Sequence, residues 1–100
     1  TMSSKLYDLA FKADFSAVSK RIQTNPNEAR FINDNNWTTL HILAWKKAPL
    51  LLLKAVYESY PSALQVRSKR GETPLDLARD NGAVQEVLVF LANSEKSQLR

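Results

Sequence analysis

His41 is the one side chain of this sequence with a pKa near neutrality, so it would be the natural acid–base group of a catalytic site. Such a site also needs a nucleophile or a carboxylate held against the imidazole. The chain has no cysteine and no second histidine, and Asp34, the acidic residue nearest along the chain, stands in a turn-forming triplet. A zinc site would need further ligands of these types. We therefore expect no catalytic residue, no metal site and no cofactor.

Asp76 and Asp80 are a second pair that could do chemistry, because two acids four residues apart share one face of a helix. Asp76 is better explained as a cap in the first helical turn, and Asp80 as a solvated charge. The two glycines, Gly71 and Gly82, do not form a phosphate-binding loop. These patterns predict that the protein is not an enzyme and has no small-molecule substrate.

The composition is that of a folded domain with 44% hydrophobic and 24% charged residues. A chain of 100 residues can bury a modest core as a single unit. Its longest apolar run, residues 48–53, is too short to span a bilayer. The first residues lack the features of a signal peptide, and this, with the lack of cysteine, favours an intracellular location.

The elements that would position these side chains are short amphipathic helices in pairs. Apolar residues at helical spacing predict helices near 5–12, 15–24, 40–46, 49–60, 74–80 and 84–92. Asp14 and Thr73 are the predicted caps, Asp76 completes a capping box, and Pro49 suits a first helical position. The tail, residues 93–100, has little to bury, so we expect it to be flexible.

Two polar connections, residues 25–38 and 61–72, are long for loops between packed helices. Each contains a turn-forming triplet, at 34–36 and 69–71, flanked by residues that suit an extended backbone. We therefore expect a hairpin-like finger to project from each connection.

The helix pairs also repeat in sequence. Residues 73–78, Thr-Pro-Leu-Asp-Leu-Ala, are echoed by residues 38–44, with Leu40 and Leu75 35 positions apart. A degenerate copy around Leu6 lies 34 positions before Leu40. A repeat at this period with this hexapeptide resembles the ankyrin repeat family, over about residues 4 to 92.

The resemblance implies an all-α solenoid of antiparallel helix pairs joined by projecting hairpin-like loops. Residues 1–100 would be a single domain with repeats at about 4–34, 35–69 and 70–92, the first degenerate, and a flexible tail at 93–100. His41 would tie adjacent finger loops together by hydrogen bonds. Thr39 and Asn36 depart from the family pattern, since a proline and a glycine are usual there.

The resemblance further implies that the inner helices and finger tips line a concave groove for protein partners. Tryptophan is common at binding hot spots, although Trp37 and Trp45 could equally be packing residues. The net charge is +4, and Arg67, Lys69 and Arg70 cluster on the second finger, which favours an acidic partner segment. The candidate partner-binding residues are Phe11, Lys12, Trp37, Trp45, Lys46, Lys47, Lys69, Arg70, Glu72 and Asp80.

Two other functions are also compatible with the sequence. Apolar residues near the end of the array, Val89 and Phe90, could stack on a second copy or on further repeats and build an assembly. Nucleic acid is a weaker candidate, because Glu28, Asp34 and Glu72 dilute any continuous track of positive charge.

Overall fold

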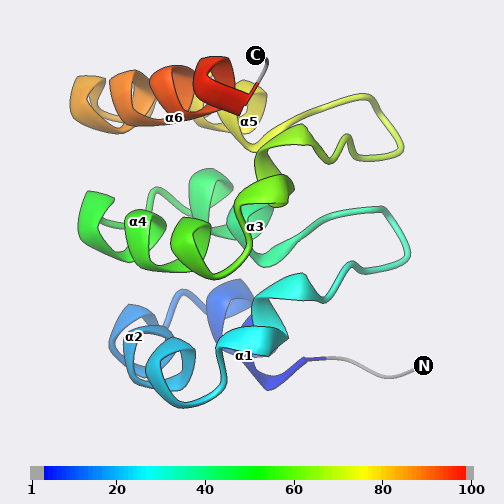
Figure 1. Cartoon of the computed structure of the whole chain (residues 1–100), viewed down its shortest axis with the longest axis vertical. Coiled ribbons are helices and arrows are strands. Elements are labelled where there is room, and N and C mark those ends of the chain that lie inside the picture. The colour runs from blue at the N-terminus through cyan, green and yellow to red at the C-terminus, as the bar shows by residue number, and fades with distance from the viewer. Residues whose placement is uncertain (1–3, 99–100) are drawn as a thin grey trace.

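This computed structural model describes residues 4–98 of the chain. Within that range, six α-helices are arranged as three stacked pairs (Figure 1). The pairs are α1 (Lys5–Phe11) with α2 (Phe15–Thr24), α3 (Thr39–Trp45) with α4 (Leu50–Ser59), and α5 (Pro74–Asp80) with α6 (Gln85–Gln98). Two 3-10 helices, η1 (Pro26–Arg30) and η2 (Pro61–Gln65), follow α2 and α4. The described residues contain no β-strand, so the predicted all-α class is confirmed.

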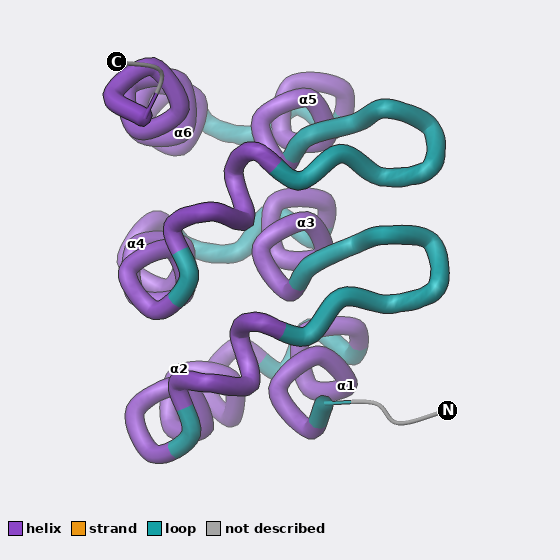
Figure 2. The backbone as a smooth tube through the Cα atoms, turned by 45° about the vertical axis from the view of Figure 1, so that its right-hand side comes forward, coloured by secondary structure: helices purple, strands orange, loops and turns teal. Residues whose placement is uncertain are grey.

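The helices stand in two columns, with α1, α3 and α5 in one and α2, α4 and α6 in the other (Figure 2). Helix α3 is central, since it packs against α1 and α5 as well as against its own partner α4. Two loops, residues 31–38 and 66–73, project side by side from the first column. The leucines that fill the space between columns and layers are fully buried: Leu6, Leu40, Leu43, Leu53, Leu64 and Leu91.

The same backbone turn ends the first helix of each pair. Ala13, Lys47 and Gly82 all adopt a positive φ, of 59°, 60° and 72°. The next backbone N–H then reaches back to the last turn of the helix, as in the bond from Ala48 to the carbonyl oxygen of Leu43 (3.0 Å). Only one of the three positions is a glycine, so the turn is not visible from glycine placement alone.

The predicted helix caps are confirmed in detail. Asp14 accepts a hydrogen bond from the N–H of Ala17 at the start of α2. Thr73 and Asp76 form the reciprocal capping box at the start of α5. One prediction was wrong: Pro49 caps α4 from an extended conformation instead of occupying the first helical position.

The predicted end of the last helix, near residue 92, was also wrong, because α6 continues to Gln98 as a regular helix. Side-chain amides hold this last turn against the preceding layer. The Nε2 of Gln98 donates to the carbonyl oxygen of Pro61 (2.9 Å), and the Nε2 of Gln65 donates to that of Glu95 (3.5 Å). These contacts are polar, so a reading based on apolar periodicity misses them. Residues 99–100 lie outside the described part of the chain.

Helices α3 and α5 begin in the same way but with different residues. The capping residues Thr38 and Thr73 have nearly identical backbone angles, −91°/172° and −92°/167°. The next position is Thr39 in α3 and Pro74 in α5, and both side chains are buried. The Thr39 hydroxyl has no hydrogen-bond partner. A buried hydroxyl without a partner costs free energy, whereas a proline at this first helical position loses no bond within the helix.

We therefore predict that Thr39→Pro raises the free energy of unfolding by about 1 kcal/mol, which is roughly 5 °C in Tm for a domain of this size. The substitution removes the unpaired hydroxyl and restricts the unfolded chain. Thermal unfolding followed by circular dichroism measures the effect. The reverse change, Pro74→Thr, is the matched control and should lower Tm by a similar amount. A lower Tm for Thr39→Pro would contradict the explanation.

Candidate partner-binding surface

Each projecting loop is held at its tip by one polar side chain. The Oδ1 of Asn33 accepts hydrogen bonds from the backbone N–H groups of Asn35 (2.9 Å) and Trp37 (2.8 Å). In the other loop, 35 positions later, the Oγ of Ser68 accepts hydrogen bonds from the backbone N–H groups of Arg70 and Glu72, both at 3.2 Å. We call the loops of residues 31–38 and 66–73 the first and second finger. Their tips are therefore ordered turns of the same design.

The two fingers are joined to each other along their length. The backbone N–H of Lys69 donates to the carbonyl oxygen of Asn35 (3.0 Å). The Nδ2 of Asn36 donates to the carbonyl oxygen of Arg67 (2.6 Å). Asn36 has a φ of 64°, where the second finger has Gly71 at 81°. Asparagine tolerates this left-handed conformation, and here its amide adds a bond that glycine could not make.

His41 makes the third link between the fingers. Its Nδ1 accepts a hydrogen bond from the backbone N–H of Thr38 (3.1 Å), which closes the capping box of α3. Its Nε2 is 3.0 Å from the carbonyl oxygen of Glu72 in the second finger. A carbonyl oxygen only accepts, so Nε2 carries the proton and the ring is neutral. The imidazole is fully buried, and this burial lowers the pKa of His41 below its ordinary value. The expectation that His41 ties the loops together is confirmed.

A hollow of about 250 Å³ opens between the joined fingers. Two of its lining residues are cationic, none is acidic, and one, Trp37, is aromatic. The lining residues are Asn35, Trp37, Ser68, Lys69 and Arg70. We call this feature the finger hollow. A small anionic group is its electrostatic complement.

A row of aromatic side chains runs from the finger hollow across α3 to α1. Trp37 and Trp45 meet edge to face with ring centroids 5.9 Å apart. The Nζ of Lys46 lies 4.8 Å from the ring centroid of Trp45 and 5.1 Å from that of Phe11. Phe11 is 55% exposed and Trp45 40% exposed. We call Phe11, Lys46, Trp45 and Trp37 the aromatic row.

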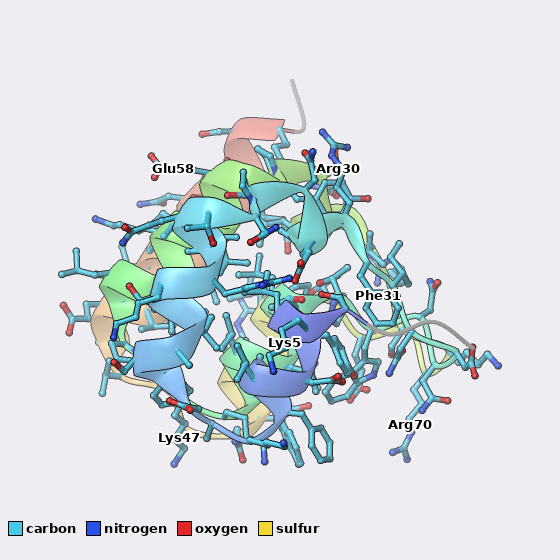
Figure 3. The ribbon with its side chains drawn as sticks, turned by 90° about the horizontal axis from the view of Figure 1, so that it is seen from below. Lys5, Arg30, Phe31, Lys47, Glu58 and Arg70 are labelled. Atoms are coloured by element: carbon cyan, nitrogen blue, oxygen red, sulfur yellow. The ribbon has the colours of Figure 1, made fainter. Side chains whose placement is uncertain are left out.

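The structure thus divides the predicted binding residues into groups. Lys69, Arg70 and Trp37 meet in the finger hollow, and Trp37 is also part of the aromatic row. Lys47 belongs to neither group. It lines a separate hollow of about 180 Å³ near Gly82, well away from Arg70 (Figure 3).

Three other predicted residues lie at the edges of this surface. Lys12 and Asp80 are exposed at the ends of α1 and α5. Glu72 is used within the second finger, where its Oε1 accepts a hydrogen bond from the Ser68 hydroxyl (3.4 Å). Its carbonyl oxygen is the one that His41 binds. Glu72 therefore supports the finger hollow without lining it.

Asn35 and Ser68, which line the finger hollow, were not among the predicted residues. Asn81 was predicted to face the groove, but the hydrogen bond from its Nδ2 to the carbonyl oxygen of Trp45 was not predicted. The signal that could have found the tips is the spacing of 35 between Asn33 and Ser68, two residues whose side chains favour such turns. Nothing local marks Asn81 as a partner of a residue 36 positions earlier.

The described residues hold no cluster of histidine, cysteine and acidic side chains suited to a metal ion. Within residues 4–98, no helix combines the length and the apolar character needed to span a membrane. The sequence matches no protein-family model, and it matches no curated protein at a significant level. What can be said of function therefore depends on the surface itself.

The buried neutral state of His41 predicts a pH dependence of stability. Because its pKa is lower in the folded state, the unfolded chain takes up a proton below about pH 6.5 that the folded chain resists. The free energy of unfolding should therefore be fully present at pH 7.5 and decrease toward pH 5, by at most about 1.4 kcal/mol per pH unit. Urea unfolding between these pH values measures it.

His41→Gln is the matched control, because glutamine can also accept the hydrogen bond from the N-cap but does not titrate. Its stability should change little between pH 7.5 and pH 5. If this variant and the original chain lost stability equally over that range, the assignment to His41 would be wrong.

Proposed function

We propose that this chain is a non-catalytic protein-interaction module of the ankyrin repeat type, and that it binds an acidic segment of a partner protein between and beside its two fingers. The hexapeptide at 73–78 and its echo at 38–44 support the family assignment. The three stacked helix pairs and the loops projecting from one column are compatible with it. Binding is the usual role of such arrays, because stacked units present an extended surface.

The observation that carries the proposal is the finger hollow. Lys69 and Arg70 bring two positive charges to a concave surface whose lining has no acid. Backbone and side-chain hydrogen bonds link the two fingers, so the surface is ordered before a partner arrives. Binding then costs little ordering of the loops, which raises affinity for a given contact area.

The other two functions find less support among the described residues. Phe90 is packed within the chain, edge to face with Tyr57 at 5.5 Å and under the Nζ of Lys54 at 5.6 Å. Val89, the other residue that could stack on a second copy, is the more exposed of the two. The carboxylate of Asp34, next to Asn35 at the tip of the first finger, interrupts any long phosphate track.

The test is affinity capture from a native cell extract with the unmodified chain and with Lys69→Glu/Arg70→Glu. The unmodified chain should capture the proteins that bind the finger hollow. The amount captured by Lys69→Glu/Arg70→Glu should be lower by at least about tenfold, because charge reversal replaces attraction by repulsion. Mass spectrometry quantifies the capture, and circular dichroism establishes that both chains are folded.

Lys20→Glu/Lys96→Glu is the matched control, because it changes the net charge equally at exposed positions on α2 and α6. Its captured proteins should be those of the unmodified chain. The proposal fails if Lys69→Glu/Arg70→Glu captures the same proteins in the same amounts, or if the control loses them equally. Capture that resists both changes would point to another surface.

A further inference from the structure

The finger hollow and the aromatic row meet at one residue, Trp37, which lines the hollow and is the last member of the row. We infer that together they recognise a two-part motif in an extended partner segment: an uncharged apolar side chain on the aromatic row and a carboxylate in the finger hollow, two positions apart. This inference rests on the proposed function, and it specifies the partner's chemistry.

The apolar half of the motif follows from the exposure of the aromatic row. Phe11 and Trp45 are 55% and 40% exposed. Polar side chains could replace them without loss of a core contact, so the fold itself does not require aromatic rings at these positions. Both are outside the buried core cluster. Exposed aromatic rings held by their neighbours offer a large contact area at a low cost in conformational entropy.

Lys46 disfavours a cationic partner side chain at the aromatic row. Its ammonium group already lies against the rings of Phe11 and Trp45, at 5.1 and 4.8 Å. A cationic side chain from a partner would have to displace this charge or approach it closely, and either is unfavourable. An aliphatic or aromatic side chain meets no such barrier on the remaining ring surface.

The carboxylate half follows from the donors that the finger hollow leaves free. The backbone N–H groups of Asn35, Lys69 and Arg70 all donate within the fingers. The donors that remain are side-chain groups: the charged ends of Lys69 and Arg70, the amide of Asn35 and the indole N–H of Trp37. A phosphate group is normally held by several backbone N–H groups as well. A carboxylate needs fewer hydrogen-bond donors, so it fits this hollow better.

The spacing of the motif follows from the separation between Trp45, whose exposed ring would take the apolar side chain, and Trp37, which lines the finger hollow. The ring centroids of Trp37 and Trp45 are 5.9 Å apart. In an extended segment, side chains two positions apart lie on the same side, about 6.5 Å from each other. One residue pair of the form apolar–any–acidic, or its reverse, therefore reaches both halves of the surface.

The probe is a display library of random 12-residue peptides, selected on the unmodified chain, on Phe11→Ser and on Lys69→Gln/Arg70→Gln. On the unmodified chain we expect Asp or Glu two positions from Leu, Ile, Met, Phe or Trp to be enriched at least about tenfold over the starting library. Phe11→Ser should retain the acidic preference and lose most of the apolar one. Lys69→Gln/Arg70→Gln should do the opposite. Lys20→Gln/Lys96→Gln should select the same motif as the unmodified chain.

Selection of acidic peptides without an apolar residue at that spacing overturns the inference and leaves the proposed function intact. Enrichment that does not depend on Lys69 and Arg70 contradicts both. The best peptide is then synthesised with phosphoserine in place of its acidic residue. Binding that is more than about tenfold tighter by fluorescence anisotropy would overturn the assignment to a carboxylate, and equal or weaker binding supports it.

Discussion

The rest of the binding surface depends on one buried ring. The imidazole of His41 satisfies a backbone donor at the start of α3 and a backbone acceptor at the end of the second finger. The Thr38 N–H would otherwise be buried without this partner, at a cost of about 1–3 kcal/mol. The Glu72 carbonyl oxygen also accepts a hydrogen bond from the Ser68 N–H (2.9 Å), so the His41 bond adds to one that is already made. Only a neutral ring can accept on one side and donate on the other. Together with the two direct hydrogen bonds between the fingers, this requirement sets the distance between them and with it the shape of the finger hollow.

The polar links explain how a small chain keeps two long loops ordered. Neither finger has an apolar core of its own, and each tip is held by Asn33 or Ser68 instead. Bonds between the fingers then join them to each other. Asn36 contributes to both the turn and the link between the fingers. Its backbone is left-handed, as the turn requires, and its side-chain amide donates a hydrogen bond to the carbonyl oxygen of Arg67. A surface built in this way is both rigid and hydrophilic, which suits recognition of a charged segment.

The sequence predicts the helices and their caps well because both follow local rules. Asp14, Thr73 and Asp76 act within one turn of their position, so their roles can be derived from neighbouring residues. The finger hollow depends on contacts between residues more than 30 positions apart, such as Asn35 with Lys69, and no local pattern encodes them. Lys46 and Lys47 were predicted as a pair, yet a left-handed turn at Lys47 directs them to different surfaces. The end of α6 was missed because amide hydrogen bonds, not apolar contacts, hold it.

The joined fingers and the aromatic row are proposed to form one binding surface. The most direct measurement is a nuclear magnetic resonance titration of the isotopically labelled chain with a synthetic peptide carrying Leu and Glu two positions apart. If the surface is one, the indole N–H signals of Trp37 and Trp45 shift together with the backbone signals of Asn35, Lys69 and Arg70, with one common Kd. Shifts confined to α2, α4 and α6, or separate affinities for the two tryptophans and the fingers, would contradict it.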